Sequence, residues 1–181
     1  MRHLFTLLMM FILIISSCKT TFQEDHKIGP TATITKKGKI ESVIFSKDAE
    51  CSLCNLGVIR FTPTLQEINE AEEILKKNIK EANVPMNNQG DGCPIIHKNL
   101  KNYRRQYFGF IDPEGNKVLY VNFSWAKYTI SDKMKGYPSP NEDTSWKEGR
   151  LIVHDGCSYH WEIEINLTKQ ILQNLSVNGL A

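Results

Sequence analysis

The sequence predicts an α+β domain in which one long helix packs on a curved antiparallel sheet of about four to five strands. Residues 65–83 repeat apolar side chains at helical spacing, between a cap and a proline. Several later segments alternate apolar and polar side chains, as half-buried strands do. The apolar stripe of a single helix needs one apolar sheet face to cover it, so the two patterns fit together.

Composition and charge narrow the class of protein. The chain has 181 residues, with 22 Lys and Arg against 20 Asp and Glu and a formal net charge of +2. This balance excludes a protein that coats nucleic acid or carries a polybasic membrane tail. Hydrophobic residues make up 41% of the chain, which excludes a disordered protein and one with several membrane spans. The length favours a single domain.

The amino terminus has the pattern of a secretory signal peptide. A short basic start precedes residues 4–15, an almost unbroken apolar run of 12 residues. A helix that spans a bilayer needs about 20 residues, so this run fits the hydrophobic region of a signal peptide. Ser16 and Ser17 follow, and small residues of this kind allow the next residue, Cys18, to enter a signal peptidase site.

Residues 15–18, Ile-Ser-Ser-Cys, resemble the lipobox of bacterial lipoproteins. The resemblance implies that residues 1–17 are a lipoprotein signal peptide. It also implies that Cys18 receives a diacylglycerol thioether and becomes the mature first residue. An ordinary signal peptide with a chance cysteine and an uncleaved membrane anchor are the alternatives. Residues 18–37 are polar, so we expect a flexible tether there and a single α+β domain over residues 38–181.

The helix is the best-defined element. Thr64 and Glu67 have the spacing of a capping box, which begins a helix. Glutamates fill the first half of the segment and lysines the second, an order that suits the helix dipole. Because Pro85 ends the pattern, we expect a helix over residues 65–83 with a solvated charged face.

Strands are expected on both sides of this helix. An Asp-Pro-Glu-Gly-Asn turn at residues 112–116 joins two apolar segments and predicts a β-hairpin. Near the carboxyl terminus, apolar and polar residues alternate over residues 159–166, which predicts a strand with one buried face and one face exposed to water. The expected strands are residues 40–46, 58–61, 103–111, 118–125, 149–153, 159–166 and 171–177.

The order of one helix followed by an antiparallel meander resembles the cystatin-like architecture. The segments RFTPT at 60–64, RQYFGFID at 105–112 and LSVNG at 175–179 also resemble uncharacterised small secreted or lipid-anchored proteins of Bacteroidetes. That resemblance covers most of residues 58–181 and carries no known catalytic motif. Protease-inhibiting cystatins use a Gln-x-Val-x-Gly loop that this sequence lacks, so the fold resemblance does not imply an inhibitor.

Four cysteines remain if Cys18 is lipidated. An even number in an exported domain suggests disulfides, and four cysteines allow three connectivities. We favour Cys51 with Cys54, which closes a tight local loop, and Cys93 with Cys157, which ties the loop after the helix to the sheet. The sequence alone leaves the other connectivities open.

Two other chemistries use the same cysteines. The spacing of Cys51 and Cys54 is that of thioredoxin-like enzymes and of half a zinc site. Nearby histidines, His97, His154 and His160, offer further metal ligands. Against a redox enzyme, the helix begins about ten residues after the motif. Against a zinc site, a second Cys-x-x-Cys is missing and an oxidising envelope competes for the thiols. This alternative site would consist of Cys51, Cys54, Cys93 and Cys157.

Two further groups of residues could form a site. His160, Glu162 and Glu164 share one strand face, as the wet face of an antiparallel sheet would also produce, and no hydrolase or phosphate-loop motif is present. Aromatic residues surround a long excursion over residues 126–148. These side chains provide contact area for a protein, peptide or glycan. Alternatively, its tryptophans pack into the core. The candidate surface is Trp125, Tyr128, Tyr137 and Trp146.

The sequence thus predicts a lipid-anchored protein of the bacterial cell envelope, periplasmic or surface-exposed, that binds a ligand without catalysis or a cofactor. Its membrane contact is the lipid on Cys18, and nucleic acid is not an expected partner. The alternatives are a thiol- or zinc-dependent enzyme and a structural subunit of an envelope complex. Neither the ligand nor the oligomeric state follows from the sequence.

Overall fold

The computed structural model describes residues 20–51, 59–84 and 86–180. One mixed sheet of eight strands runs in the order β1-β2-β3-β5-β6-β7-β8, and β4 pairs with β5. The strands are β1 (Gln23–Ile28), β2 (Ala32–Lys37), β3 (Ile40–Phe45), β4 (Ile59–Phe61), β5 (Tyr103–Ile111), β6 (Lys117–Trp125), β7 (His160–Asn166) and β8 (Ile171–Val177). The helices are α1 (Leu65–Ala82), α2 (Ile96–Asn99) and α3 (Ile130–Met134). Short 3₁₀ turns lie at Leu100–Asn102, Ser145–Lys147 and Cys157–Tyr159.

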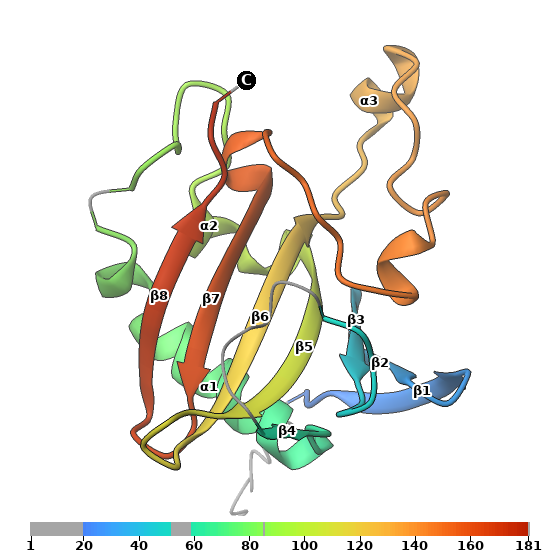
Figure 1. The fold of residues 1–181 in the computed structure, drawn as a ribbon. Helices are drawn as coiled ribbons and strands as arrows, with labels where there is room; N and C mark the ends of the chain where they lie inside the picture. Colours follow the sequence, from blue (N-terminus) through green and yellow to red (C-terminus); the bar gives the residue numbers. More distant parts are fainter. Residues whose placement is uncertain (1–19, 52–58, 85, 181) are drawn as a thin grey trace, which may run out of the picture.

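The predicted helix is confirmed as α1, and its capping box is formed. The Glu67 backbone N–H donates to Thr64 Oγ1 at 3.2 Å, and the Thr64 N–H donates to Glu67 Oε2 at 2.9 Å. The two bonds satisfy donors that the first helical turn leaves without partners, which fixes where the helix begins. Figure 1 shows α1 lying across one face of strands β5 to β8.

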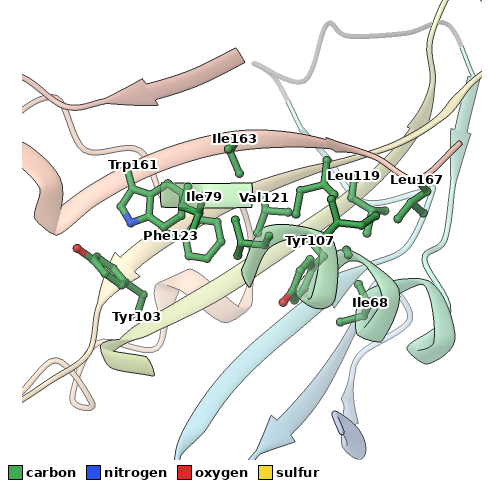
Figure 2. Close-up of a cluster of buried hydrophobic side chains, with 14 of the residues drawn as sticks. Ile68, Ile79, Tyr103, Tyr107, Leu119, Val121, Phe123, Trp161, Ile163 and Leu167 are labelled. Carbon is green, nitrogen blue, oxygen red and sulfur yellow. The ribbon is translucent and has the colours of Figure 1, made fainter. Parts of the chain in front are cut away.

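The main hydrophobic core lies between α1 and this face of the sheet. Apolar residues of α1 meet every second residue of the facing strands, as the two periodicities require. Trp161 stacks on Phe123 with ring centroids 3.7 Å apart, and Tyr103 meets Trp161 edge-on at 5.7 Å. Figure 2 shows the labelled side chains of this cluster: Ile68, Ile79, Tyr103, Tyr107, Leu119, Val121, Phe123, Trp161, Ile163 and Leu167.

A second hydrophobic cluster covers the opposite face of the sheet. Phe45 and Phe108 stack there at 4.5 Å, and Trp146 from the long connection between β6 and β7 packs on the same cluster. Gln106 on this face donates hydrogen bonds to the backbone oxygens of Trp146 and Gly149, both at 2.6 Å. The connection therefore covers this face of the sheet. We expected the face to be exposed to water, and that prediction is wrong.

The predicted fold class is wrong. One long helix on about four to five antiparallel strands, resembling the cystatin-like architecture, does not describe a mixed sheet of eight strands with three helices in the described residues. Residues 23–28 and 32–37, which we expected within a flexible tether, form β1 and β2. Residues 149–153, expected to begin a strand, do not form one.

Physical reasons account for these differences. β1 is exposed along almost its whole length, so its sequence lacks the alternation that marks a half-buried strand. β3 pairs with β5 in parallel, and residues 46–102 between them include α1. A parallel pair needs such a crossover, and its partners are too far apart in sequence for local patterns to indicate the pairing. The hairpin of β5 and β6 and the strands β7 and β8 are confirmed.

Candidate functional site

A cleft of about 590 Å³ lies at one end of the sheet. β3 and β5 are parallel, so their amino ends meet at this end, and β6 finishes there because Tyr103 pairs with Trp125. The volume lies within the range of small-molecule sites, about 300–1,000 Å³. Three segments line it: the β2–β3 turn, the start of β5, and the chain after β6. Its residues are Lys36, Gly38, Lys39, Ile40, Glu41, Lys101, Asn102, Tyr103, Arg104, Ala126, Lys127, Tyr128 and Asn141.

The lining of this cleft carries five cations and one carboxylate, and we call it the basic cleft. The cations are Lys36, Lys39, Lys101, Arg104 and Lys127, and the carboxylate is Glu41. Glu41 Oε1 is already 3.2 Å from Lys147 Nζ, outside the lining. The cleft therefore has a local positive charge that the near-neutral net charge of +2 conceals.

Three of these cations form no ion pair within the described residues, although the charge of Lys127 acts at longer range on Asp132. In the part of the chain that the structure describes, no carboxylate lies within ion-pair distance of Lys39, Lys101 or Lys127. All three side chains are exposed and open to a ligand. Ammonium groups that share a concave surface raise the local concentration of anions.

The other two cations are held in place. Lys36 Nζ lies 2.8 Å from Asp25 Oδ2. The hydrogen bonds from Lys36 and His26 lower the pKa of Asp25, so this carboxylate stays ionised. Arg104 donates from Nη2 to the Pro140 carbonyl at 2.7 Å, and its guanidinium lies 4.7 Å from the centre of the Trp146 ring. Burial lowers the pKa of Arg104, but an arginine remains charged at neutral pH.

The four aromatic residues of the predicted surface do not form one patch. Trp125 is half-buried and meets Tyr103 and Tyr159 edge-on at 5.1 and 5.4 Å. Trp146 is buried in the second cluster. Tyr128 lines the basic cleft and donates from its hydroxyl to the Tyr137 carbonyl at 2.8 Å, while Tyr137 itself is 58% exposed. The tryptophans therefore pack structurally, and the tyrosines lie at or near the cleft.

The cysteines form disulfides in the described chain. The predicted bond between Cys93 and Cys157 is confirmed, with a Cα–Cα distance of 6.2 Å. Cys51 is also disulfide-bonded, and its predicted partner Cys54 lies outside the described residues. In this oxidised form neither Cys93 nor Cys157 is a thiolate, so neither can act as a nucleophile or as a thiolate metal ligand.

The polar row on β7 is covered rather than wet. Arg150 donates from Nε to the Tyr120 hydroxyl at 2.8 Å and from Nη2 to Glu162 Oε2 at 2.7 Å, and Tyr120 also donates to Glu162. Glu164 is buried and accepts from Gln173 and Asn174 at 2.8 Å each. The carboxylates of Glu162 and Glu164 therefore accept hydrogen bonds from neighbouring side chains of the same domain.

His160 is the first residue of this row, and it lines a cavity of about 210 Å³ with Arg150 and His154. Burial lowers the pKa of His160, with a smaller contribution from Arg104. The imidazole is therefore neutral at neutral pH.

Comparison with known protein families, curated proteins and solved structures finds no match. None of the described helices is both long and apolar enough to cross a membrane. The basic cleft was missed by the sequence analysis because its cations come from segments that are far apart in the chain. The run Lys36-Lys37-Gly38-Lys39 is the one local signal, and the expected boundary between tether and domain divided it after Lys37.

Proposed function

We propose that this protein is a lipid-anchored, non-enzymatic protein of the bacterial cell envelope that binds an anionic ligand in the basic cleft. The observation that carries the proposal is the group of three exposed lysines, Lys39, Lys101 and Lys127, none of which forms an ion pair with a described residue. A charged saccharide suits the remaining lining, because the amides of Asn102 and Asn141 can bind hydroxyl groups and Tyr128 offers an aromatic ring. The anchor is proposed from the lipobox at residues 15–18.

A thiol- or zinc-dependent enzyme is less well supported. Two of its four required sulfur atoms are bonded to each other. A structural subunit of an envelope complex would need no concave basic surface, so the cleft favours the binding protein.

The anchor is tested by the intact mass and terminal peptide of the protein purified from membranes. We expect the mature chain to begin at Cys18 and to carry a diacylglycerol group on that cysteine. An unmodified Cys18, or an amino terminus at another residue, would contradict the proposed lipidation and leave the cleft proposal standing.

The cleft is tested with sucrose octasulfate, a small sulfated saccharide, and with sucrose as its neutral counterpart. Calorimetry at low salt should detect binding of the sulfated sugar alone. The variant Lys39→Gln/Lys101→Gln/Lys127→Gln should bind at least about tenfold more weakly, because three exposed ion pairs of about 0.5 kcal/mol each correspond to that factor.

The matched control removes the same charge from the exposed face of α1. Lys76, Lys77 and Lys80 are exposed there and lie outside the cleft lining. The variant Lys76→Gln/Lys77→Gln/Lys80→Gln should bind like the wild type. Equal losses in the two triple variants would mean that net charge, and not the cleft, controls binding.

A further inference from the structure

The segment of residues 129–137, which we call the arm, exposes three apolar side chains. Ile130 is 81% exposed, Met134 83% and Tyr137 58%. Ile130 and Met134 are four residues apart on α3, so they share one face of the helix. Figure 1 shows α3 projecting away from the sheet, beyond the end of β6. Exposed apolar side chains grouped on a projecting element indicate an interaction surface.

Local hydrogen bonds hold the arm in this form. Thr129 and Asp132 make a capping box, with the Thr129 N–H donating to Asp132 Oδ2 at 2.7 Å and the Asp132 N–H donating to Thr129 Oγ1 at 3.1 Å. At its other end, the Tyr137 N–H donates to the Asp132 carbonyl at 3.1 Å, and Tyr128 binds the Tyr137 carbonyl. The apolar side chains are therefore presented by a preformed turn of helix.

Positive charge flanks the apolar residues. Lys133 and Lys135 are exposed, and neither has an ion pair with any described residue. Asp132 is the one acidic residue of the arm, and its hydrogen bonds from Thr129 lower its pKa, with smaller contributions from the charges of Lys135 and Lys127. The carboxylate stays ionised and caps the helix, so the arm carries two positive charges and one negative charge. What remains outward is an apolar face with two cations beside it.

We infer that the arm binds the surface of a bilayer that contains anionic lipids. Ile130 and Met134 enter the boundary between headgroups and acyl chains, Tyr137 lies at headgroup level, and Lys133 and Lys135 contact lipid phosphates. The two lysines favour a bilayer over a protein partner, because lysine is depleted from protein–protein interfaces and is common on the polar side of interfacial helices. This inference goes beyond the proposed function and needs no lipid on Cys18.

Vesicle sedimentation tests the arm without the lipid anchor. The protein is the chain from residue 18 with Cys18→Ser, which retains both hydrophobic clusters, because the first residue of one is Phe22 and the first buried residue of the other is Ala32. The vesicles contain equal parts of phosphatidylcholine and phosphatidylglycerol, or phosphatidylcholine alone. We expect sedimentation with the anionic vesicles, weakened by added salt. Ile130→Ser/Met134→Ser should lower the partition coefficient at least about tenfold, because the two serines have much less apolar surface to bury in the bilayer than the side chains they replace.

The matched control removes exposed apolar side chains elsewhere. Val84 is 73% exposed and Leu180 69% exposed, and neither belongs to the arm. Val84→Ser/Leu180→Ser should partition like the parent protein. A further variant, Lys133→Gln/Lys135→Gln, should lose most of the salt-sensitive part of binding. Circular dichroism and urea unfolding of each variant show whether it is folded.

Three results would overturn the inference. They are an absence of binding to the anionic vesicles at low salt, undiminished binding by Ile130→Ser/Met134→Ser, and equal binding to phosphatidylcholine alone. Loss of a co-purifying protein by the Ile130→Ser/Met134→Ser variant, with vesicle binding intact, would make the arm a protein-docking surface instead. The cleft variant Lys39→Gln/Lys101→Gln/Lys127→Gln leaves the arm residues unchanged. Failure of the arm and failure of the cleft are therefore separate results.

Discussion

Replacement of Glu72 by alanine should lower the free energy of unfolding by about 3–5 kcal/mol. Glu72 lies on α1 and accepts from Arg105 of β5, at 2.9 Å from Nε and 3.3 Å from Nη2. The Arg105 side chain is 1% exposed and the Glu72 side chain 9% exposed. Removing the carboxylate therefore leaves a buried guanidinium without its counter-charge. Urea unfolding followed by circular dichroism measures the change.

Other contacts of this pair increase the expected loss. Tyr107 donates from its hydroxyl to Glu72 Oε1 at 2.7 Å, and burial raises the pKa of Tyr107, so the hydroxyl stays protonated. Alanine would leave that donor unsatisfied as well. Glu81→Ala is the control, because Glu81 is exposed on the same helix and should change stability by less than about 0.5 kcal/mol. A similar small loss for Glu72→Ala would show that the pair does not tie α1 to the sheet.

Loss of the Cys93–Cys157 disulfide should be the second large effect. The bond closes a loop with a sequence separation of 64 residues. Chain-entropy arithmetic for a loop of that length gives about 4 kcal/mol. The variant Cys93→Ala/Cys157→Ala should therefore unfold at a clearly lower urea concentration. The remaining contacts of the joined segments, such as Tyr159 Oη to the Gly92 carbonyl at 3.0 Å, do not cross-link the unfolded chain.

Substitution, rather than reduction, isolates this bond, because Cys51 is disulfide-bonded too. The matched control is Cys51→Ala/Cys54→Ala, which removes the predicted local pair. A cross-link between residues three apart restricts the unfolded chain much less, so we expect a smaller change. If the two double variants were equally destabilised, loop entropy would not explain the contribution of the Cys93–Cys157 bond.

Local signals predicted the elements that depend on neighbouring residues. The capping box at Thr64 located the start of α1, and the turn at residues 112–116 located the β5–β6 hairpin. Both features join residues that are close in sequence, so periodicity and turn chemistry are sufficient to find them. The Cys93–Cys157 pairing was favoured among three connectivities that the sequence left open, and the structure contains it.

Long-range features were not predictable in the same way. β1 is an exposed edge strand, β2 pairs with it on one side and with β3 on the other, and the parallel pairing of β3 with β5 depends on a crossover of residues 46–102. The basic cleft depends on that pairing, since it brings Lys39 and Lys101 to one end of the sheet. Composition gave no warning of the cleft, because acidic residues elsewhere balance its lysines in the net charge of +2.

The central claim is that the basic cleft holds an anionic ligand, and chemical-shift mapping tests it most directly. Isotope-labelled protein, the chain from residue 18 with Cys18→Ser, is titrated with sucrose octasulfate and then with sucrose. We predict shifts of backbone amides concentrated at residues 36–41, 101–104 and 126–128, with the sulfated sugar alone. Shifts spread over all exposed lysines, or centred away from these three segments, would contradict the account.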